Sequence, residues 1–183
     1  MDTTAVISNK IKKIQSLYLN DLYSTHIEDE YEKMVNLFSG LFASKQRILE
    51  NITRFNSPEF PRFMVYTDFE QEESGNFKFS YQLQVLISTS SQVFTFYYDN
   101  RVDNRSSEKL AEQIEFISEE CYFIKAKHNE MEIERELVKY GYTRLHSSLY
   151  DKSIGSYYQN FEPIKSISAT SSVYALLFDN IMS

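Results

Sequence analysis

A run of alternating apolar and polar side chains in residues 76–100 constrains the fold more than any other feature of this chain. Between Phe77 and Ile87 every second residue is aromatic or aliphatic, and the residues between them are mostly Lys, Ser and Gln. This period of two predicts a long β-strand with one buried face. Residues 93–98 predict its hairpin partner. Residues 89–92 predict a loop of about four or five residues, because they lack the Asn-Gly or Gly-Gly pair of a two-residue turn.

The segment before this hairpin predicts two helices and one strand. Apolar residues at helical spacing indicate an amphipathic helix over residues 4–24 and a second one over about residues 28–55. The second helix has so wide an apolar stripe that it must pack on a large surface. The first helix, the sheet and the same helix of another subunit all remain open as that surface. A strand is expected over residues 62–70, and the polar, acidic residues 71–75 predict a turn into the hairpin.

The segment after the hairpin predicts alternating helices and strands. Polar residues 99–105 predict a connection, followed by a helix from Ser106 or Ser107 with Leu110, Ile114 and Ile117 as its buried stripe. Residues 121–127 fit an extension of that helix or a short strand, and their β-favouring side chains favour the strand. A helix is expected from residues 129–130 to 140, with Gly141 as its left-handed C-cap. Strands are predicted over residues 142–150 and 173–178, joined by a Ser- and Tyr-rich connection over residues 153–170.

These predictions together describe an α+β fold. We expect a mostly antiparallel mixed sheet of about five to six strands with flanking helices and an N-terminal pair of long helices, because an apolar sheet face must be covered. Residues 1–57 would form the helical pair and pack on the same domain, and residues 58–183 would form the sheet domain. The length of 183 residues suits a single compact unit of this kind.

The composition narrows the class of protein. The single cysteine, Cys121, allows no internal disulfide and suits a reducing compartment. We find no signal-peptide pattern and no apolar run long enough to span a membrane, so a cytoplasmic protein is expected. The net charge of −7 disfavours direct binding of nucleic acid, which requires clustered Lys and Arg, and no membrane binding is expected.

The motifs of common catalytic and metal sites are missing from the sequence. It contains no Cys-x-x-Cys, no His-Glu-x-x-His, no Gly-x-Ser-x-Gly and no glycine-rich phosphate loop. The three histidines, His26, His128 and His146, lie far apart in the chain. We therefore expect no metal, no nucleophilic catalysis and no resident cofactor.

The order of predicted elements resembles the GNAT superfamily of acetyl-CoA-dependent N-acetyltransferases, mainly over residues 62–150. The local likeness is a helix opened by Asn129 that ends in Lys139-Tyr140-Gly141-Tyr142. The resemblance implies acetyl-CoA as cofactor, with its pyrophosphate bound in a loop before a helix N-terminus. It assigns that contact to Arg101, Arg105, Ser106 and Ser107, and the pantetheine arm to Asn129.

The charge pattern favours a different function, a non-enzymatic acidic protein-binding module. We expect an inhibitor or immunity-type antagonist of a basic, nucleic-acid-handling protein, attracted by a negative helical side and anchored by exposed tyrosines. A divergent acyl-CoA-dependent N-acetyltransferase is the alternative, and a structural dimer or adaptor joined through the helix of residues 31–55 is the third reading. The residues expected to contact the basic partner are Glu112, Glu115, Glu119, Glu130, Glu134, Tyr97, Tyr98, Tyr157 and Tyr158.

Overall fold

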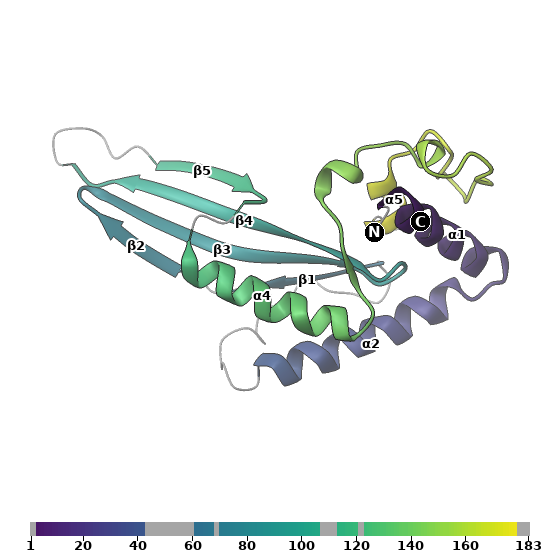
Figure 1. The fold of residues 1–183 in the computed structure, drawn as a ribbon, viewed down its shortest axis with the longest axis horizontal. Coiled ribbons are helices and arrows are strands. Elements are labelled where there is room, and N and C mark those ends of the chain that lie inside the picture. The colour runs from purple at the N-terminus through teal and green to yellow at the C-terminus, as the bar shows by residue number, and fades with distance from the viewer. Residues whose placement is uncertain (1–2, 43–60, 68–69, 107–112, 121–122, 179–183) are drawn as a thin grey trace.

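The fold was analysed in a computed structural model, which describes residues 3–42, 61–67, 70–106, 113–120 and 123–178. The described chain is α+β, as predicted, with a mixed, mostly antiparallel sheet of six strands and an N-terminal pair of helices (Figure 1). In this part of the chain, no helix combines the length and apolar character needed to cross a bilayer.

The predicted hairpin is the centre of the sheet. Strand β3, Phe77–Ser88, pairs antiparallel with β4, Val93–Asn104, over twelve residue pairs. The four-residue loop between them is confirmed, and Gln92 closes it in the left-handed region with φ of 57°. Strand β4 is longer than predicted. Residues 99–104, expected as a polar connection, continue it because each still has a partner on β3.

Two short strands share the other edge of β3. Strand β1, Arg62–Tyr66, pairs with the half of β3 near the loop, and β2, Glu70–Ser74, pairs with the distant half. The prediction of a turn over residues 71–75 is wrong for residues 71–74, which belong to β2. The turn lies at Gly75, whose φ of 59° suits glycine. Strands β5, Gln113–Ser118, and β6, Thr143–Arg144, pair with β4, and β6 runs parallel to it.

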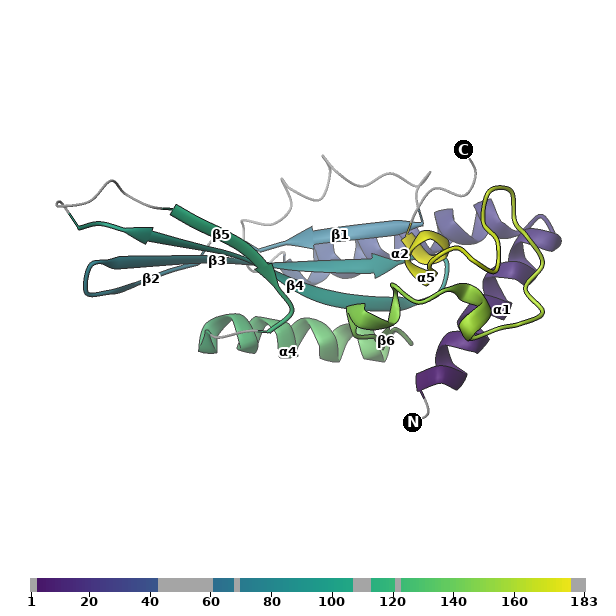
Figure 2. The same ribbon diagram turned by 90° about the horizontal axis from the view of Figure 1, so that it is seen from above.

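Helices α2, Tyr23–Phe42, and α4, Ile124–Lys139, cover one face of the sheet (Figures 1 and 2). That face carries the alternating apolar residues of β3, so the stripe of α2 packs on the sheet of its own chain. The rest of the predicted helix, residues 43–55, lies outside the described residues. The shared core includes Met34, Leu37, Phe38, Phe63, Val65, Leu83, Val85, Phe96, Ile133 and Leu137.

A second core joins helix α1, Thr3–Leu19, to the C-terminal segment. It includes helix α5, Val173–Phe178, and two 3-10 helices, Ser147–Leu149 and Ile154–Ser156, and it reaches Leu86 and Val93 of the hairpin. In Figure 2 α1 and α5 lie at the loop end of β3 and β4, while the opposite end of the sheet extends away from them.

Several predicted elements are wrong. Residues 113–118 form strand β5, not a helix, and Ile114 and Ile117 are exposed rather than buried. Residues 124–127 are helical, so the strand favoured there is wrong for them, while Cys121 and Tyr122 lie outside the described residues. Residues 173–178 are helix α5, and only two residues of the strand predicted over 142–150 pair with the sheet. Each misassigned segment is short, and a short apolar run does not distinguish strand from helix by its period.

The ends of two helices follow backbone rules that the sequence only partly revealed. Gly141 has φ of 85° and ends α4 as predicted, with Tyr142 N–H donating to the Leu137 carbonyl at 3.0 Å. Helix α1 ends in the same way at Asp21, φ 56°, so α2 begins earlier than predicted and contains His26.

Candidate functional site

The distant half of the sheet carries an exposed apolar surface. Helix α4 begins at Ile124, and Figure 1 shows β2 and the adjoining ends of β3 and β4 extending beyond this point. The helix-covered face is therefore open there, although its strands keep their apolar side chains. We call this the distal surface and define it as Phe77, Phe79, Val102, Ile114, Phe116 and Phe123.

The exposure of these side chains is high for apolar residues. The exposed fractions are 45% for Phe77, 58% for Ile114 and 43% for Phe116. Phe79 and Phe123 are half-buried beneath them, with ring centroids 6.5 Å apart. Large apolar groups gathered on one surface mark an interaction site in many proteins, whereas single exposed ones do not.

A cavity of about 370 Å³ opens in the distal surface. Its apolar lining includes Phe79, Phe116 and Phe123, and Tyr81 supports Phe123 by ring stacking at 4.0 Å. Asn100 supplies a buried polar group, and its amide donates hydrogen bonds of 3.0 Å to the Tyr98 carbonyl and the Ser118 hydroxyl. These bonds fix the Asn100 side chain in the cavity wall and connect it to Ser118 at the end of β5. The remaining lining residues are Glu72, Glu73, Ser74, Ser80, Arg101 and Val102.

The charges around the distal surface are mainly negative. Residues 70–106, 113–120 and 123–127 contain eight carboxylates and five Lys or Arg side chains. Arg101 contacts Asp99 at 3.4 Å and Glu115 at 3.5 Å, and Arg105 contacts Glu73 at 2.8 Å. Because the arginines are already paired with carboxylates, the excess charge presented to a partner is negative.

The residues that the resemblance assigned to a cofactor lie in other surroundings than expected. Arg101 is in β4, paired with Ser80 and Glu115 across its two neighbours, and not in a loop. Arg105 N–H donates to the Asn76 carbonyl at 2.7 Å, which extends the strand pairing by one residue. Ser106 follows β4, and Ser107 lies outside the described residues. Asn129 is in the second turn of α4, so the expectation that it opens a helix is wrong.

The carboxylates expected on one helical side are spread over different elements. Glu115 is on strand β5, and Glu119 contacts His146 at 2.9 Å. Glu130 is 7% exposed, accepts a hydrogen bond from the Tyr98 hydroxyl and pairs with Arg144 at 2.5 Å. Glu134 pairs with the same arginine at 2.9 Å, and Glu112 lies outside the described residues. Glu130 is therefore held in a buried cluster with Tyr98 and Arg144, so its expected place on an exposed helical side is wrong.

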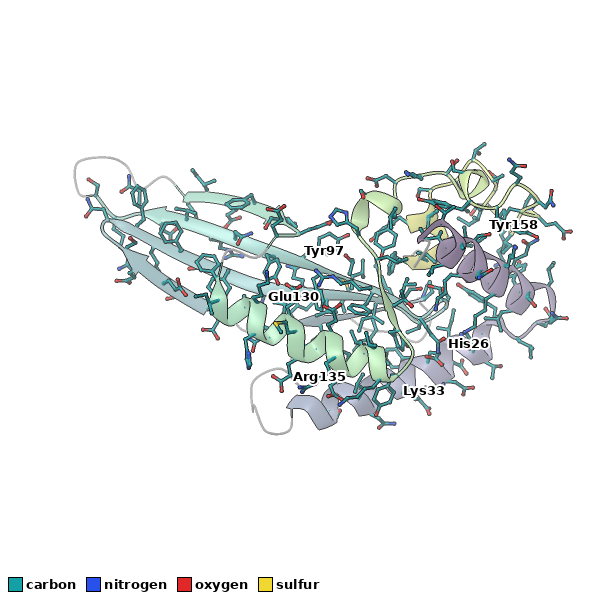
Figure 3. The ribbon with its side chains drawn as sticks, in the orientation of Figure 1. His26, Lys33, Tyr97, Glu130, Arg135 and Tyr158 are labelled. Atoms are coloured by element: carbon teal, nitrogen blue, oxygen red, sulfur yellow. The ribbon has the colours of Figure 1, made fainter. Side chains whose placement is uncertain are left out.

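The four predicted anchor tyrosines do not form one surface. Tyr98 is 1% exposed, so its predicted exposure is wrong. Burial raises the pKa of Tyr97 to about 12, and this residue lines a second cavity of about 220 Å³ on the opposite sheet face. Tyr157 and Tyr158 are half-buried in the C-terminal segment beside Lys152 and Lys12. Figure 3 shows Tyr97 and Tyr158 well separated.

The structure also contains a polar centre that the sequence did not reveal. Glu30 is 2% exposed and accepts hydrogen bonds from Tyr142 Oη at 2.8 Å, Lys33 Nζ at 2.5 Å and Gln92 Nε2 at 3.3 Å. Burial alone raises the pKa of Glu30, but the bonds from Lys33 and Tyr142 outweigh it, and the pKa lies below its usual value. This carboxylate therefore connects α2 to Gln92 of the β3–β4 loop and to Tyr142, the residue after the Gly141 cap of α4.

Three cationic or titratable side chains surround this centre. Lys10 Nζ donates to the Gln92 carbonyl, and Lys13 Nζ donates to Gln92 Oε1, both at 3.3 Å. Burial, followed by the charge of Lys13, lowers the pKa of His26, whose Nε2 atom is buried without a hydrogen-bond partner among the described residues. Figure 3 shows His26 on α2 beside α1. The arrangement stabilises the junction of the two cores.

Comparisons with protein-family models, curated proteins and solved structures found no match to this chain.

Proposed function

We propose that this protein is a binding module for a basic protein partner and that it binds through the distal surface. The observation that carries the proposal is the exposure of Phe77, Ile114 and Phe116 around one cavity, in a region with excess carboxylates. The proposal keeps the predicted class of function. It replaces the predicted contact residues, because Tyr98 and Glu130 are buried.

The apolar part of the surface accounts for affinity. Full burial of a Phe or Ile side chain contributes about 1.5–3 kcal/mol, and these three side chains are about half exposed on average. Aromatic anchors that fill a pocket dominate the binding energy of many interfaces. The cavity between Phe116 and Phe123 would receive such an anchor from the partner.

The charged part of the surface accounts for partner choice. An excess of carboxylates attracts Lys- and Arg-rich segments and repels acidic ones. Proteins that handle nucleic acid carry such basic segments, so they remain the expected partner class. A module that covers such a segment would act as an antagonist of its partner.

The acyl-CoA alternative has less support. A pyrophosphate site requires free backbone N–H groups at a helix N-terminus or free cationic side chains. Arg101 and Arg105 are both engaged by carboxylates, and the segment up to Asn104 is extended strand.

The proposal is tested by selecting binders from a displayed library of random twelve-residue peptides. Enriched sequences are expected to combine aromatic or aliphatic residues with Lys or Arg. Binding of the selected peptides is expected to weaken at least tenfold in the variants Phe116→Ser and Phe77→Ser. Leu22→Ser is the matched control, because Leu22 is 55% exposed but lies between α1 and α2, outside the distal surface.

Enrichment of acidic or uncharged peptides would contradict the electrostatic part of the proposal. Equal binding to the Phe77→Ser variant and to the unmodified protein would contradict the assigned surface.

A further inference from the structure

Strand β5 is an edge strand with apolar side chains on both faces. Among the described residues it pairs with β4 alone, and Figure 1 shows it at the margin of the sheet. Ile114 and Phe116 share the helix-covered face with Asn100 and Val102, whereas Ile117, 69% exposed, lies on the opposite face. An edge strand left open and apolar on both faces is a hazard that folded proteins usually avoid by placing charges, Pro or bulges there.

The backbone groups of β5 that remain open follow from the pairing. The Arg105 N–H bonds to the carbonyl of Asn76, the residue before β3. Because hydrogen-bonded pairs alternate along an antiparallel ladder, the backbone N–H and C=O groups of the odd-numbered residues of β4 point toward β3. The backbone groups of the even-numbered residues of β4 point toward its other edge, as the 3.0 Å bond from Leu145 N–H to the Phe94 carbonyl also shows. Ile114, Phe116 and Ser118 pair with even-numbered residues and therefore bond to β4. The N–H and C=O groups of Gln113, Glu115 and Ile117 point outward.

We propose that β5 binds an extended segment of the basic partner by antiparallel strand addition. The inference rests on the proposed function and states its binding mode. The added strand would bond to the three outward residues of β5 and present apolar side chains beside Ile114 and Phe116, where they continue into the distal surface. On the opposite face it would place Lys or Arg beside Glu115, whose side chain is 56% exposed. An added strand of alternating apolar and basic residues satisfies both faces.

Charge favours such a partner over a second copy of this chain. Two copies of β5 related by a two-fold axis must pair residues that share a face. The register that pairs all three outward residues of each copy places Glu115 against Glu115 and Gln113 against Ile117. Like charges that face each other directly are destabilising. This pairing also brings together two regions that each contain eight carboxylates and five Lys or Arg side chains.

The test uses a synthetic peptide complementary to β5. Read antiparallel to Ser118–Gln113, its sequence is Thr-Ile-Val-Lys-Val-Lys, extended by one Lys at each end and labelled with a fluorophore. Two N-methylated forms serve as a matched pair. In one form, the backbone N atoms of the Ile and of the Lys between the two Val residues are methylated, and these residues lie opposite Ile117 and Glu115. In the other form, the backbone N atoms of the two Val residues are methylated. Binding to the full chain is followed by fluorescence anisotropy.

Strand addition predicts that methylation opposite Ile117 and Glu115 weakens binding at least tenfold, while methylation of the two Val residues changes it less than twofold. In the protein, Ile117→Pro removes one outward N–H without breaking a bond to β4, and it should weaken binding more than Ile117→Thr does. Circular dichroism of both variants checks that the sheet is intact. Edge strands tolerate Pro where the N–H faces solvent.

Other outcomes separate this inference from the proposed function. If both methylated forms bind like the unmodified peptide and Phe77→Ser weakens all three, strand addition is overturned and the distal surface stands. If neither this peptide nor any library peptide binds, both proposals fail. A dimer in sedimentation analysis that Ile117→Pro dissociates would assign β5 to a second copy and overturn the inference.

Discussion

Removal of the buried Glu30 carboxylate provides the sharpest test of how the two cores are joined. In Glu30→Ala, the Tyr142 hydroxyl, on a residue 3% exposed, loses its acceptor, and Gln92 and Lys33 lose a partner as well. We expect the folded state to lose stability while the fold itself persists, because the apolar contacts of both cores remain.

The magnitude follows from these three contacts. A hydrogen bond to a charged group contributes about 1.5–3 kcal/mol, and an unsatisfied buried hydroxyl costs about 1–3 kcal/mol. The bond from Lys33, which is 56% exposed, contributes about 0–1 kcal/mol after solvent screening, and the 3.3 Å bond from Gln92 adds little. Glu30→Ala should therefore lower the free energy of unfolding by about 3 kcal/mol. Tyr142→Phe should lower it by about 1.5 kcal/mol, since it leaves the other two partners in place.

Urea denaturation followed by circular dichroism measures both changes and their coupling. The double variant should be less destabilised than the sum of the single ones by about 1–2 kcal/mol. Glu32→Ala is the control, because Glu32 is exposed on the same helix, and a change within about 0.5 kcal/mol is expected. A loss below about 1 kcal/mol for Glu30→Ala, or additive effects of the two substitutions, would refute the assignment of Glu30 as the joining group.

Three further predictions address titration, backbone conformation and the cofactor alternative. Because the pKa of His26 is lowered in the folded state, the unfolded state binds more protons below about pH 6.5. Stability should then rise as the pH increases from about 5 to 7, and His26→Gln should flatten this slope in denaturation curves. Gly141→Ala should lower the melting temperature by about 2–4 °C, because φ is 85° there, whereas Gly40→Ala, inside α2, should raise it. Calorimetric titration with acetyl-CoA should show no binding, since Arg105 is paired with Glu73, and micromolar binding that Arg105→Glu abolishes would support the transferase reading instead.

Features determined by local sequence were the most accessible to prediction. The alternation from Phe77 to Ile87 specifies the central strand because a one-residue slip would expose every apolar side chain of that face. Gly141 indicates the end of α4, since a residue without Cβ adopts the left-handed conformation at no steric cost. The apolar stripe of α2 required a large partner surface, but the stripe alone did not select the sheet over another helix.

The tertiary structure decided the state of the short segments. Residues 113–118 have apolar side chains that suit a helix or a strand, and they form β5 because β4 continues to Asn104 and offers an edge for pairing. Residues 173–178 are apolar throughout, so they fit a buried helix against the second core as well as a buried strand. In both cases a surface far away in the sequence makes the choice.

The candidate site depended on the tertiary structure for the same reason. The sequence shows that Phe77, Ile114 and Phe116 are apolar, but only the position of α4, which begins partway along the sheet, leaves them uncovered together. Conversely, Glu30 and Glu130 read as surface charges because nothing local distinguishes them from their exposed neighbours. Their burial depends on Tyr142, Tyr98 and Arg144, which the fold brings to them from distant parts of the chain, and such contacts have no signature in local sequence.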